Sequence, residues 1–576
     1  MSTGGRAPVD LRLAPAALAV WFACWWATGA GTRAVAIAAV GVPALAGVVT
    51  ILLSSLPGAS PARRRPARSD AHDGRFGASM ATLAPAVALA AGAAAIALAT
   101  CATQLAVRDR SGLADLAAAG RVVTVEATVR DDPVPLRSTW GQDVLLASLD
   151  VSAVDDGARS WRAAAPVLVR GDPRWAALAV GTRVVVTGRL GPADPGAREV
   201  AQLAPVRSPD VRAPPRGPVA VADALRSGLM GVTDDLSPQA RALVPGVAVG
   251  DVTRLPDDLD VAMRTVGLTH VTAVSGGHFA IVVATLSGLC TVLGLGRWTR
   301  LGVLGPATAG FVLLVRPDPS VVRSAAMCAV TLAGTALGRR ARAVPALAAS
   351  VVVLLVADPW LARAFGFVLS VAATAGIVLL AGPLARRLSA WLPRSVALVV
   401  AVPVAAQAAC GPVLVLLAPA VSAWSVPANL VADPALAPAT VLGVLATLVT
   451  PLWPAGAHML AWAAGCATWW IARVATIASG LPGASVRWTG GPFGALLLAV
   501  ATAAAGAALW SWRSLALAAG VRVPWAPGSR PSLAGWSWVV RGTLRACLQR
   551  PDRPAAPPSP APPARASPLR SSRSRR

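Results

Sequence analysis

The sequence predicts an α-helical membrane protein with about twelve spans and a small inserted β-barrel domain outside the membrane. The chain has 576 residues, is 55% hydrophobic and carries only 14% charged residues. Apolar runs long enough to cross a bilayer core of about 30 Å recur along it. One stretch of the N-terminal half instead alternates apolar and polar residues, as strands do. Together these patterns exclude an ordinary soluble globule.

The strong positive charge has a topological explanation. The formal net charge is +25, and every basic residue is Arg. Arginines gather between apolar runs, which the positive-inside rule assigns to cytoplasmic loops. Both termini then lie in the cytoplasm and the chain crosses the inner (plasma) membrane several times. The arginines concerned are Arg63, Arg64, Arg65, Arg68, Arg297, Arg300, Arg339, Arg340, Arg342, Arg386 and Arg387.

Residues 1–110 form the first predicted unit, a three-helix membrane segment. Its apolar runs are Leu13–Ala30, Ala34–Gly58 and Gly77–Ala106. Each run is long enough for one span. No small-residue cleavage site follows the first run, so we expect an uncleaved anchor.

Residues 115–215 form the second unit. Short alternating runs at 121–130, 144–151, 166–169, 183–190 and 199–206 are separated by Asp-Gly, Gly-Asp-Pro and Gly-Pro turn signals. Five strands in about 90 residues favour a small barrel, and an OB-like barrel is the natural candidate. The third membrane run places this domain outside the cytoplasm.

The remaining chain divides into three further parts. Residues 216–262 are amphipathic and rich in Asp, so we expect them along the outer membrane–water boundary. Residues 263–520 hold nine apolar runs and form a transmembrane domain. Residues 525–576 are rich in Pro, Ser and Arg, which predicts a disordered cytoplasmic tail. The nine runs are 271–296, 301–315, 320–337, 343–357, 364–382, 394–418, 425–450, 455–478 and 493–519.

Polar groups inside the apolar runs are the candidate functional residues. In hydrocarbon each unpartnered polar group costs several kcal/mol, so such residues are retained for a reason. His270, Ser275, Gly276, Gly277 and His278 predict a broken helix beside a polar path, although a small-residue helix contact explains the glycines equally well. Further candidates for this path are Asp251, Arg323, Asp358, Ser370, Gln407 and Asn429.

Arg323 is the strongest candidate for contacting a passing phosphate. It lies about one turn into an apolar run, where an Arg normally faces a cavity or a carboxylate. Asp358 and Asp251 are the alternative salt-bridge partners. Snorkelling of the side chain to the outer interface is the other interpretation.

Five motifs in series carry a family resemblance. They are Val244–Asp251, Gly267–His278, Pro317–Met327, Ala357–Trp360 with Gly366–Thr374, and Ser425–Pro434. In this order they resemble the signature of the ComEC family of competence proteins. The segment Gly181–Leu190 is similar to the OB-like region of that family.

The resemblance implies a channel that translocates single-stranded DNA into the cytoplasm during natural transformation. It also implies a cytoplasmic helicase-like motor and a membrane-anchored DNA receptor as partners, besides the lipid bilayer. Many family members add a metallo-β-lactamase-like nuclease domain, which needs several clustered His and Asp ligands. With four histidines in the chain, we expect no metal, no cofactor, no enzymatic activity and a separate nuclease.

The residues of the predicted barrel domain support DNA binding less strongly than the family resemblance does. Trp140, Trp161 and Trp175 could stack bases beside Arg137, Arg162 and Arg170, or they could be core tryptophans. Between Asp115 and Pro215 twelve Arg face twelve Asp and Glu, whereas phosphate binding favours a basic excess.

Two other functions fit the same residues. Broken helices and a buried Arg also suit a secondary transporter of a small anion or metabolite. A non-conducting envelope protein is the second alternative. The oligomeric state, including a homo-oligomer, stays open.

Overall fold

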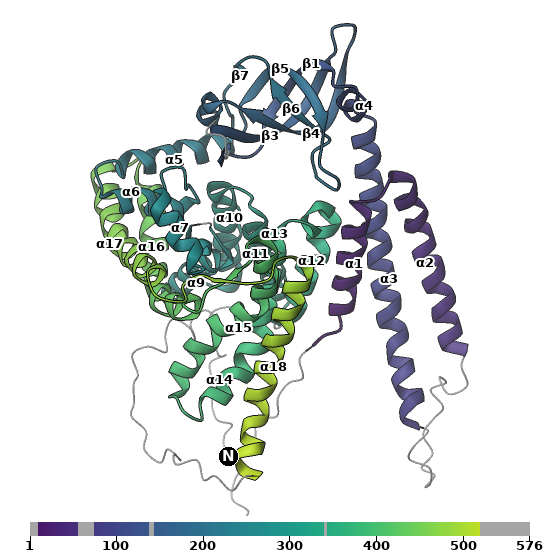
Figure 1. The fold of residues 1–576 in the computed structure, drawn as a ribbon, viewed down its shortest axis with the longest axis vertical. Helices are drawn as coiled ribbons and strands as arrows, with labels where there is room; N and C mark the ends of the chain where they lie inside the picture. The colour runs from purple at the N-terminus through teal and green to yellow at the C-terminus, as the bar shows by residue number, and fades with distance from the viewer. Residues whose placement is uncertain (1–9, 56–73, 138–142, 273, 339–341, 519–576) are drawn as a thin grey trace, which may run out of the picture.

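The computed structural model describes residues 10–55, 74–137, 143–272, 274–338 and 342–518 (Figure 1). The predicted disordered tail lies outside these residues. A β-domain lies at one end of a larger helical body, and three N-terminal helices stand at the side of that body.

Seven described helices are long and apolar enough to cross a membrane, and three shorter ones are also apolar. The structure therefore supports a membrane protein, while the count of about twelve spans stays a prediction. The long segments are Thr32–Thr50, Pro85–Asp109, Arg297–Val315, Phe365–Leu388, Arg394–Leu417, Ser425–Val449 and Gly491–Leu509; the shorter ones are Ala14–Ala27, Gly276–Val292 and Ala343–Ala357.

The N-terminal helices are α1 (Ala14–Ala27), α2 (Thr32–Ser55) and α3 (Gly74–Asp109), close to the three predicted runs. Helix α1 joins the helical body, because Val20 and Cys24 pack in one cluster with Leu355 and Phe367. Only 6% of the apolar window of α2 is buried. An apolar helix with so little protein around it is suited to lipid.

The β-domain follows α3 through the short helix α4 (Leu113–Ala118). Its strands pair in the order β1–β3–β4–β6–β5, and β5 pairs back to β1. These five strands therefore form a closed circuit, in which only the β4–β6 pair is parallel. The elements are β1 (Val122–Val129), β2 (Val134–Arg137), β3 (Asp143–Asp155), β4 (Ser160–Gly171), η1 (Pro173–Ala177), β5 (Arg183–Pro192), β6 (Ala201–Pro205) and β7 (Asp210–Ala213).

Alternating side chains build the core of this domain. In β1 every second residue, from Val123 to Val129, is buried, as period-two alternation requires. Gly188 in β5 allows a close approach, because an added Cβ would lie 2.5 Å from the Ala204 carbonyl oxygen. The five predicted strand regions are confirmed, and β2 and β7 are additional.

The helical body begins with α5 (Pro218–Val232), α6 (Pro238–Val249), α7 (Asp257–Thr265), α8 (Thr269–Thr272) and α9 (Gly276–Val292). It continues through helices that match the other predicted runs within a few residues. These are α10 (Arg297–Val315), α11 (Pro319–Ala336), α12 (Ala343–Ala357), η2 (Pro359–Ala362), α13 (Phe365–Gly376), η3 (Ile377–Ala381), α14 (Gly382–Leu388), α15 (Arg394–Leu417), β8 (Ala420–Val421), α16 (Ser425–Val449), α17 (Pro454–Ser479), β9 (Val486–Arg487) and α18 (Gly491–Ala518).

Helix α6 differs from the interfacial position predicted for residues 216–262. Its residues from Leu243 to Val249 are all buried, and it packs against α16 and α17. Gly443 of α16 permits this contact, since a Cβ there would lie 2.8 Å from the Ala248 Cβ. The reason is visible in the sequence of α6, whose second half is apolar on every face, and such a helix is buried.

The turn between α16 and α17 lies next to α5. In the structure a Cβ on Gly228 of α5 would lie 2.7 Å from a Thr450 side-chain carbon. His458 Nδ1 lies 2.9 Å from the carbonyl oxygen of Val232, at the end of α5. Since α5 is bonded to the β-domain, this turn lies on the β-domain side of the protein (Figure 1).

Chemical labelling tests this position. In a background without the natural cysteines, Leu452→Cys is expected to react with a membrane-impermeant maleimide from the same side as Val206→Cys in the β-domain. Both residues are largely exposed. Trp298→Cys, at the far end of α10, should react only from the other side. Labelling of position 452 together with position 298 would contradict the structure.

Candidate functional site

The predicted break in the helix is present between residues 266 and 276. Helix α7 ends at Thr265, α8 is a single turn and α9 begins at Gly276. Ser275 caps α9, because its Oγ accepts a hydrogen bond of 3.3 Å from the Gly277 N–H. His278 completes the cap, as its Nδ1 accepts from the Ser275 N–H at 3.0 Å.

Arg323 is buried in the helical body. Its side chain belongs to α11, and the residue is only 4% exposed. Nε donates to Ser370 Oγ at 2.8 Å, one terminal nitrogen to Ser324 Oγ at 2.9 Å, and the other lies 3.1 Å from Met327 Sδ. Within the described ranges no carboxylate forms an ion pair with this guanidinium. The structure thus brings Arg323 and Ser370 together, as two members of the predicted path.

The alternatives for Arg323 are wrong. A buried side chain does not snorkel to the interface. Asp358 instead pairs with Arg198 at 2.5 Å, and Asp251 pairs with Arg226 at 3.4 Å. Both carboxylates have arginines from another region of the chain as partners, and spacing along the sequence does not reveal this.

Gly276 joins the helix break to the buried arginine. An added Cβ at Gly276 would lie 2.5 Å from a terminal nitrogen of Arg323 and 2.7 Å from Ser324 Oγ. The first turn of α9 therefore contacts α11 at the guanidinium itself. The sequence left two explanations for Gly276, a close helix contact and a helix break. In the structure Gly276 begins α9 after the break and also allows the close contact with α11.

His278 contributes a second buried donor. The residue is fully buried. Because Nδ1 accepts the backbone bond of the cap, the neutral ring carries its proton on Nε2. Among the described residues that atom has no hydrogen-bond partner at normal hydrogen-bond geometry. A buried donor without a partner costs about 1–3 kcal/mol, so its retention calls for an explanation.

A pocket of about 300 Å³ opens beside this region. It lies between the α7–α8 segment and the start of α11. Its lining includes two carboxylates and one guanidinium, and Thr272 and Val274 bring it up to the helix break. The lining residues are Gly250, Val252, Leu255, Asp260, Arg264, Thr269, Thr272, Val274, Val315 and Asp318.

Other predicted path residues are not joined to Arg323 by the described contacts. Asn429 donates to the Ser425 carbonyl oxygen of its own helix at 2.6 Å. Gln407 lies half-buried on α15, and His270 is exposed with Nδ1 3.2 Å from the Gly267 carbonyl oxygen. Asp358 caps η2, because its Oδ1 accepts a hydrogen bond of 3.2 Å from the Trp360 N–H. These contacts of Asn429, His270 and Asp358 therefore each join residues within four positions of one another in the chain.

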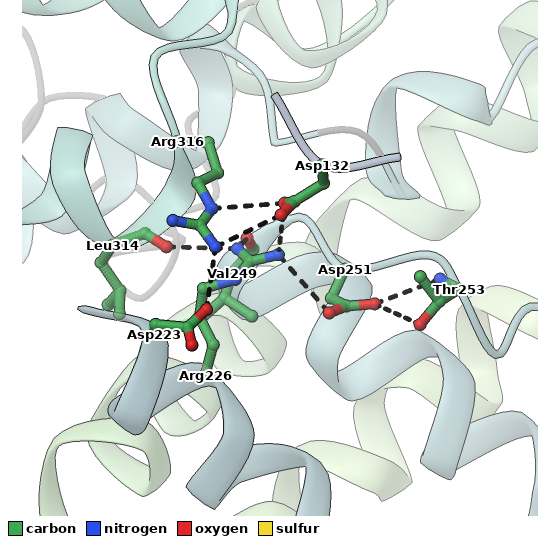
Figure 2. A network of polar contacts seen from close by, with 8 residues as sticks. All are labelled: Asp132, Asp223, Arg226, Val249, Asp251, Thr253, Leu314 and Arg316. Atoms are coloured by element: carbon green, nitrogen blue, oxygen red, sulfur yellow. Dashed lines mark hydrogen bonds and ion pairs between the residues drawn. The ribbon is translucent and has the colours of Figure 1, made fainter. Parts of the chain in front are cut away.

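A cluster of ion pairs ties the β-domain to the helical body (Figure 2). Asp132, in the β1–β2 loop, accepts two bonds of 3.2 Å from Arg316 and one of 3.2 Å from Arg226. Arg316 also donates to Asp223 of α5 at 3.1 Å. We call Asp132, Asp223, Arg226, Asp251 and Arg316 the clasp.

Backbone contacts strengthen the clasp. Arg226 is 5% exposed and donates to the carbonyl oxygens of Val249 and Leu314, near the ends of α6 and α10. Burial lowers the pKa of the Arg226 guanidinium, and the Asp132 carboxylate acts in the opposite direction. Arg316 has φ +74°, the one positive φ outside glycine in the described ranges. The sequence reasoning missed Asp132, Asp223, Arg226 and Arg316, and only Asp251 was singled out.

The predicted DNA contacts of the β-domain divide into four groups. Trp175 is fully buried in the domain core and does not stack a base, which corrects that prediction. Trp161 is partly buried, donates to the Ser111 carbonyl oxygen at 3.0 Å and has Arg159 over its ring. Arg162 and Arg170 are exposed on β4. The Arg137 and Trp140 side chains lie outside the described residues.

Fold and site together define a class: a multi-helix membrane protein whose β-domain is clasped to a helical body, and this body buries an arginine whose described partners are uncharged. Within that class, residues 247–513 match the family model described as Competence protein. This segment belongs to the competence protein family of the ComEC type. The match runs from α6 to α18, so it includes Gly276, Arg323 and Ser370 but not the β-domain.

One curated relative gives independent support. The ComE operon protein 3 of Bacillus subtilis (strain 168) is 32% identical over 156 residues. The matched segment covers 27% of this chain and only 20% of the relative, about a fifth of its length. No solved structure matches the chain.

The glycine contact gives a direct test. Gly276→Ala should destabilise the protein by about 1–3 kcal/mol, because its Cβ would overlap the Arg323 guanidinium. Gly288→Ala, in the same helix, is the matched control, since nothing lies within 4 Å of its added Cβ. The control should be neutral or slightly stabilising. Thermal unfolding in detergent measures both, and equal effects would contradict the contact.

The clasp gives a second test. Asp132→Asn leaves two guanidiniums without their shared carboxylate and should lower the free energy of unfolding by about 1–3 kcal/mol. Asp150→Asn is the control, because its nearest arginine nitrogen lies 3.9 Å away and its side chain is 59% exposed. That change should cost less than about 0.5 kcal/mol. If Asp150→Asn lowered the free energy of unfolding as much as Asp132→Asn, the clasp would contribute no more to stability than an exposed ion pair.

Proposed function

We propose that the chain is a channel of the inner (plasma) membrane that passes single-stranded DNA into the cytoplasm during natural transformation. The family of residues 247–513 supports a role in DNA uptake. The observation that carries the channel is Arg323, a buried guanidinium with hydroxyl and thioether partners in place of a carboxylate.

An unpaired buried cation is costly. Desolvating a guanidinium costs several kcal/mol, and hydroxyl groups return only part of this. A passing phosphate would supply the missing negative charge and form a bidentate pair with Arg323. The unpartnered Nε2–H of His278 is a further donor in the same region. Conduction requires such a contact to be strong enough to admit the strand and weak enough to release it.

The closed arrangement implies a moving part. Arg323 and His278 are sealed from solvent, so α9 must separate from α11 or α13 before a strand passes. The break at residues 266–276 provides a hinge for α9. The pocket lined by Thr272, Val274 and Asp318 lies beside this break and the start of α11.

The remaining parts of the proposal concern the surroundings. The closed strand circuit with its parallel β4–β6 pair is the pattern of an OB-like barrel, which we propose outside the cytoplasm, where Arg162 and Arg170 meet DNA. The chain has no Lys and so no phosphate-binding loop of the Walker type. We propose that a cytoplasmic helicase-like motor supplies the force and that a membrane-anchored receptor delivers the DNA. A separate nuclease would carry out any strand degradation. The chain itself is then not an enzyme.

Replacing Arg323 tests the function apart from folding. Arg323→Met should reduce import of labelled DNA into the cytosol at least tenfold while DNA binding at the cell surface is retained. Because the buried charge lacks a carboxylate, its removal should leave thermal stability unchanged or raise it.

Arg297→Met is the matched control, since Arg297 lies at an exposed helix start over the ring of Trp298. It should import DNA normally. Normal import by Arg323→Met would reject this site. Normal import even after deletion of the gene would reject the DNA channel and favour transport of a small anion or metabolite.

A further inference from the structure

A second pocket lies between the β-domain and the N-terminal helices, away from Arg323 and from the clasp. Its volume is about 280 Å³. The floor is the last two turns of α3, the wall is β-domain, and Trp360 of η2 closes one side. The lining residues are Thr103, Gln104, Val107, Arg108, Arg130, Asp150, Ala164, Pro166, Arg198 and Trp360.

The lining is cationic, with three arginines against one aspartate. Arg198 is committed to Asp358 at 2.5 Å. Arg108 donates to the Ala197 carbonyl oxygen at 3.0 Å, and within the described ranges it has no carboxylate in an ion pair. Arg130 is held only loosely, with Asp131 and Asp150 each 3.9 Å away. Two guanidiniums therefore keep donors for an anion.

The position of the pocket identifies the kind of anion. Thr103, Gln104 and Val107 belong to the end of the candidate span Pro85–Asp109, where lipid headgroups lie. Val107 is 50% exposed, so an apolar surface continues from the pocket along α3. Trp360 donates to the Ala197 carbonyl oxygen at 3.1 Å and is the aromatic type that gathers at membrane interfaces.

We propose that this pocket binds the phosphate headgroup of an anionic phospholipid, with the acyl chains along α3. Arg108 and Arg130 hold the phosphate by charge-assisted hydrogen bonds. Gln104 orients the floor by donating to the Ala357 carbonyl oxygen at 3.0 Å. The bound lipid then bridges three parts of the protein, α3, η2 and the β-domain. A DNA phosphate is less suited, because the pocket opens beside apolar helix surface.

Lipid titration of the purified full-length chain tests the proposal. Phosphatidylglycerol should bind the delipidated protein in detergent more tightly than phosphatidylcholine, as counted by native mass spectrometry. Arg130→Gln should weaken phosphatidylglycerol binding about tenfold, the loss expected for one charge-assisted hydrogen bond. Arg130→Lys keeps the charge and should retain most of the affinity.

Arg162→Gln is the matched control, an exposed arginine of the same domain outside the pocket, and it should bind lipid like the wild type. Thermal unfolding checks that each variant is folded. Equal affinity for both lipids, or an Arg130→Gln variant that is folded and binds phosphatidylglycerol normally, overturns the site. Displacement of the lipid by a single-stranded oligonucleotide would assign the pocket to DNA. Inorganic phosphate at the same concentration should not displace it.

Discussion

The carboxylate of Asp132, shared between Arg226 and Arg316, fixes how the β-domain meets the helical body. Arg226 also binds carbonyl oxygens near the C-terminal ends of α6 and α10, where the helix dipole favours a cation. Arg316 adopts a backbone conformation that costs of order 1–3 kcal/mol in a residue other than glycine. Its three side-chain hydrogen bonds to Asp132 and Asp223 offset that strain. Arg316 lies just before α11, the helix that carries Arg323.

Two buried arginines of the same body illustrate opposite electrostatic solutions. Arg226 has two carboxylates within 3.4 Å and two backbone carbonyls, so its charge is satisfied. Arg323 is equally buried, and its partners in the described part of the chain are all neutral. The first arrangement is typical of a permanent joint, because breaking it would leave charges uncompensated. The second leaves capacity for an anion, and this difference, rather than burial itself, distinguishes a structural arginine from a candidate ligand.

Hydropathy and alternation predicted the elements well, since both depend on neighbours along the chain. The strand regions, the helix bounds and the break at Ser275 follow from local patterns. What local patterns do not contain is the identity of distant partners. Asp132 and Arg316 are 184 positions apart, and Asp358 meets Arg198 across 160. For the same reason Trp175 was open to two interpretations.

The seams between helices differ in how easily they can part. The seam between α6 and α16 is closed by Gly443 against Ala248 and by an extensive apolar core, so opening it would expose buried hydrocarbon. The seam between α11 and α13 at Arg323 is bridged by a hydroxyl contact, from Nε to Ser370 Oγ, which a phosphate oxygen can replace. On its other side the guanidinium meets the first turn of α9 at Gly276, and that turn is anchored in the helical body by the buried His278 and Phe279.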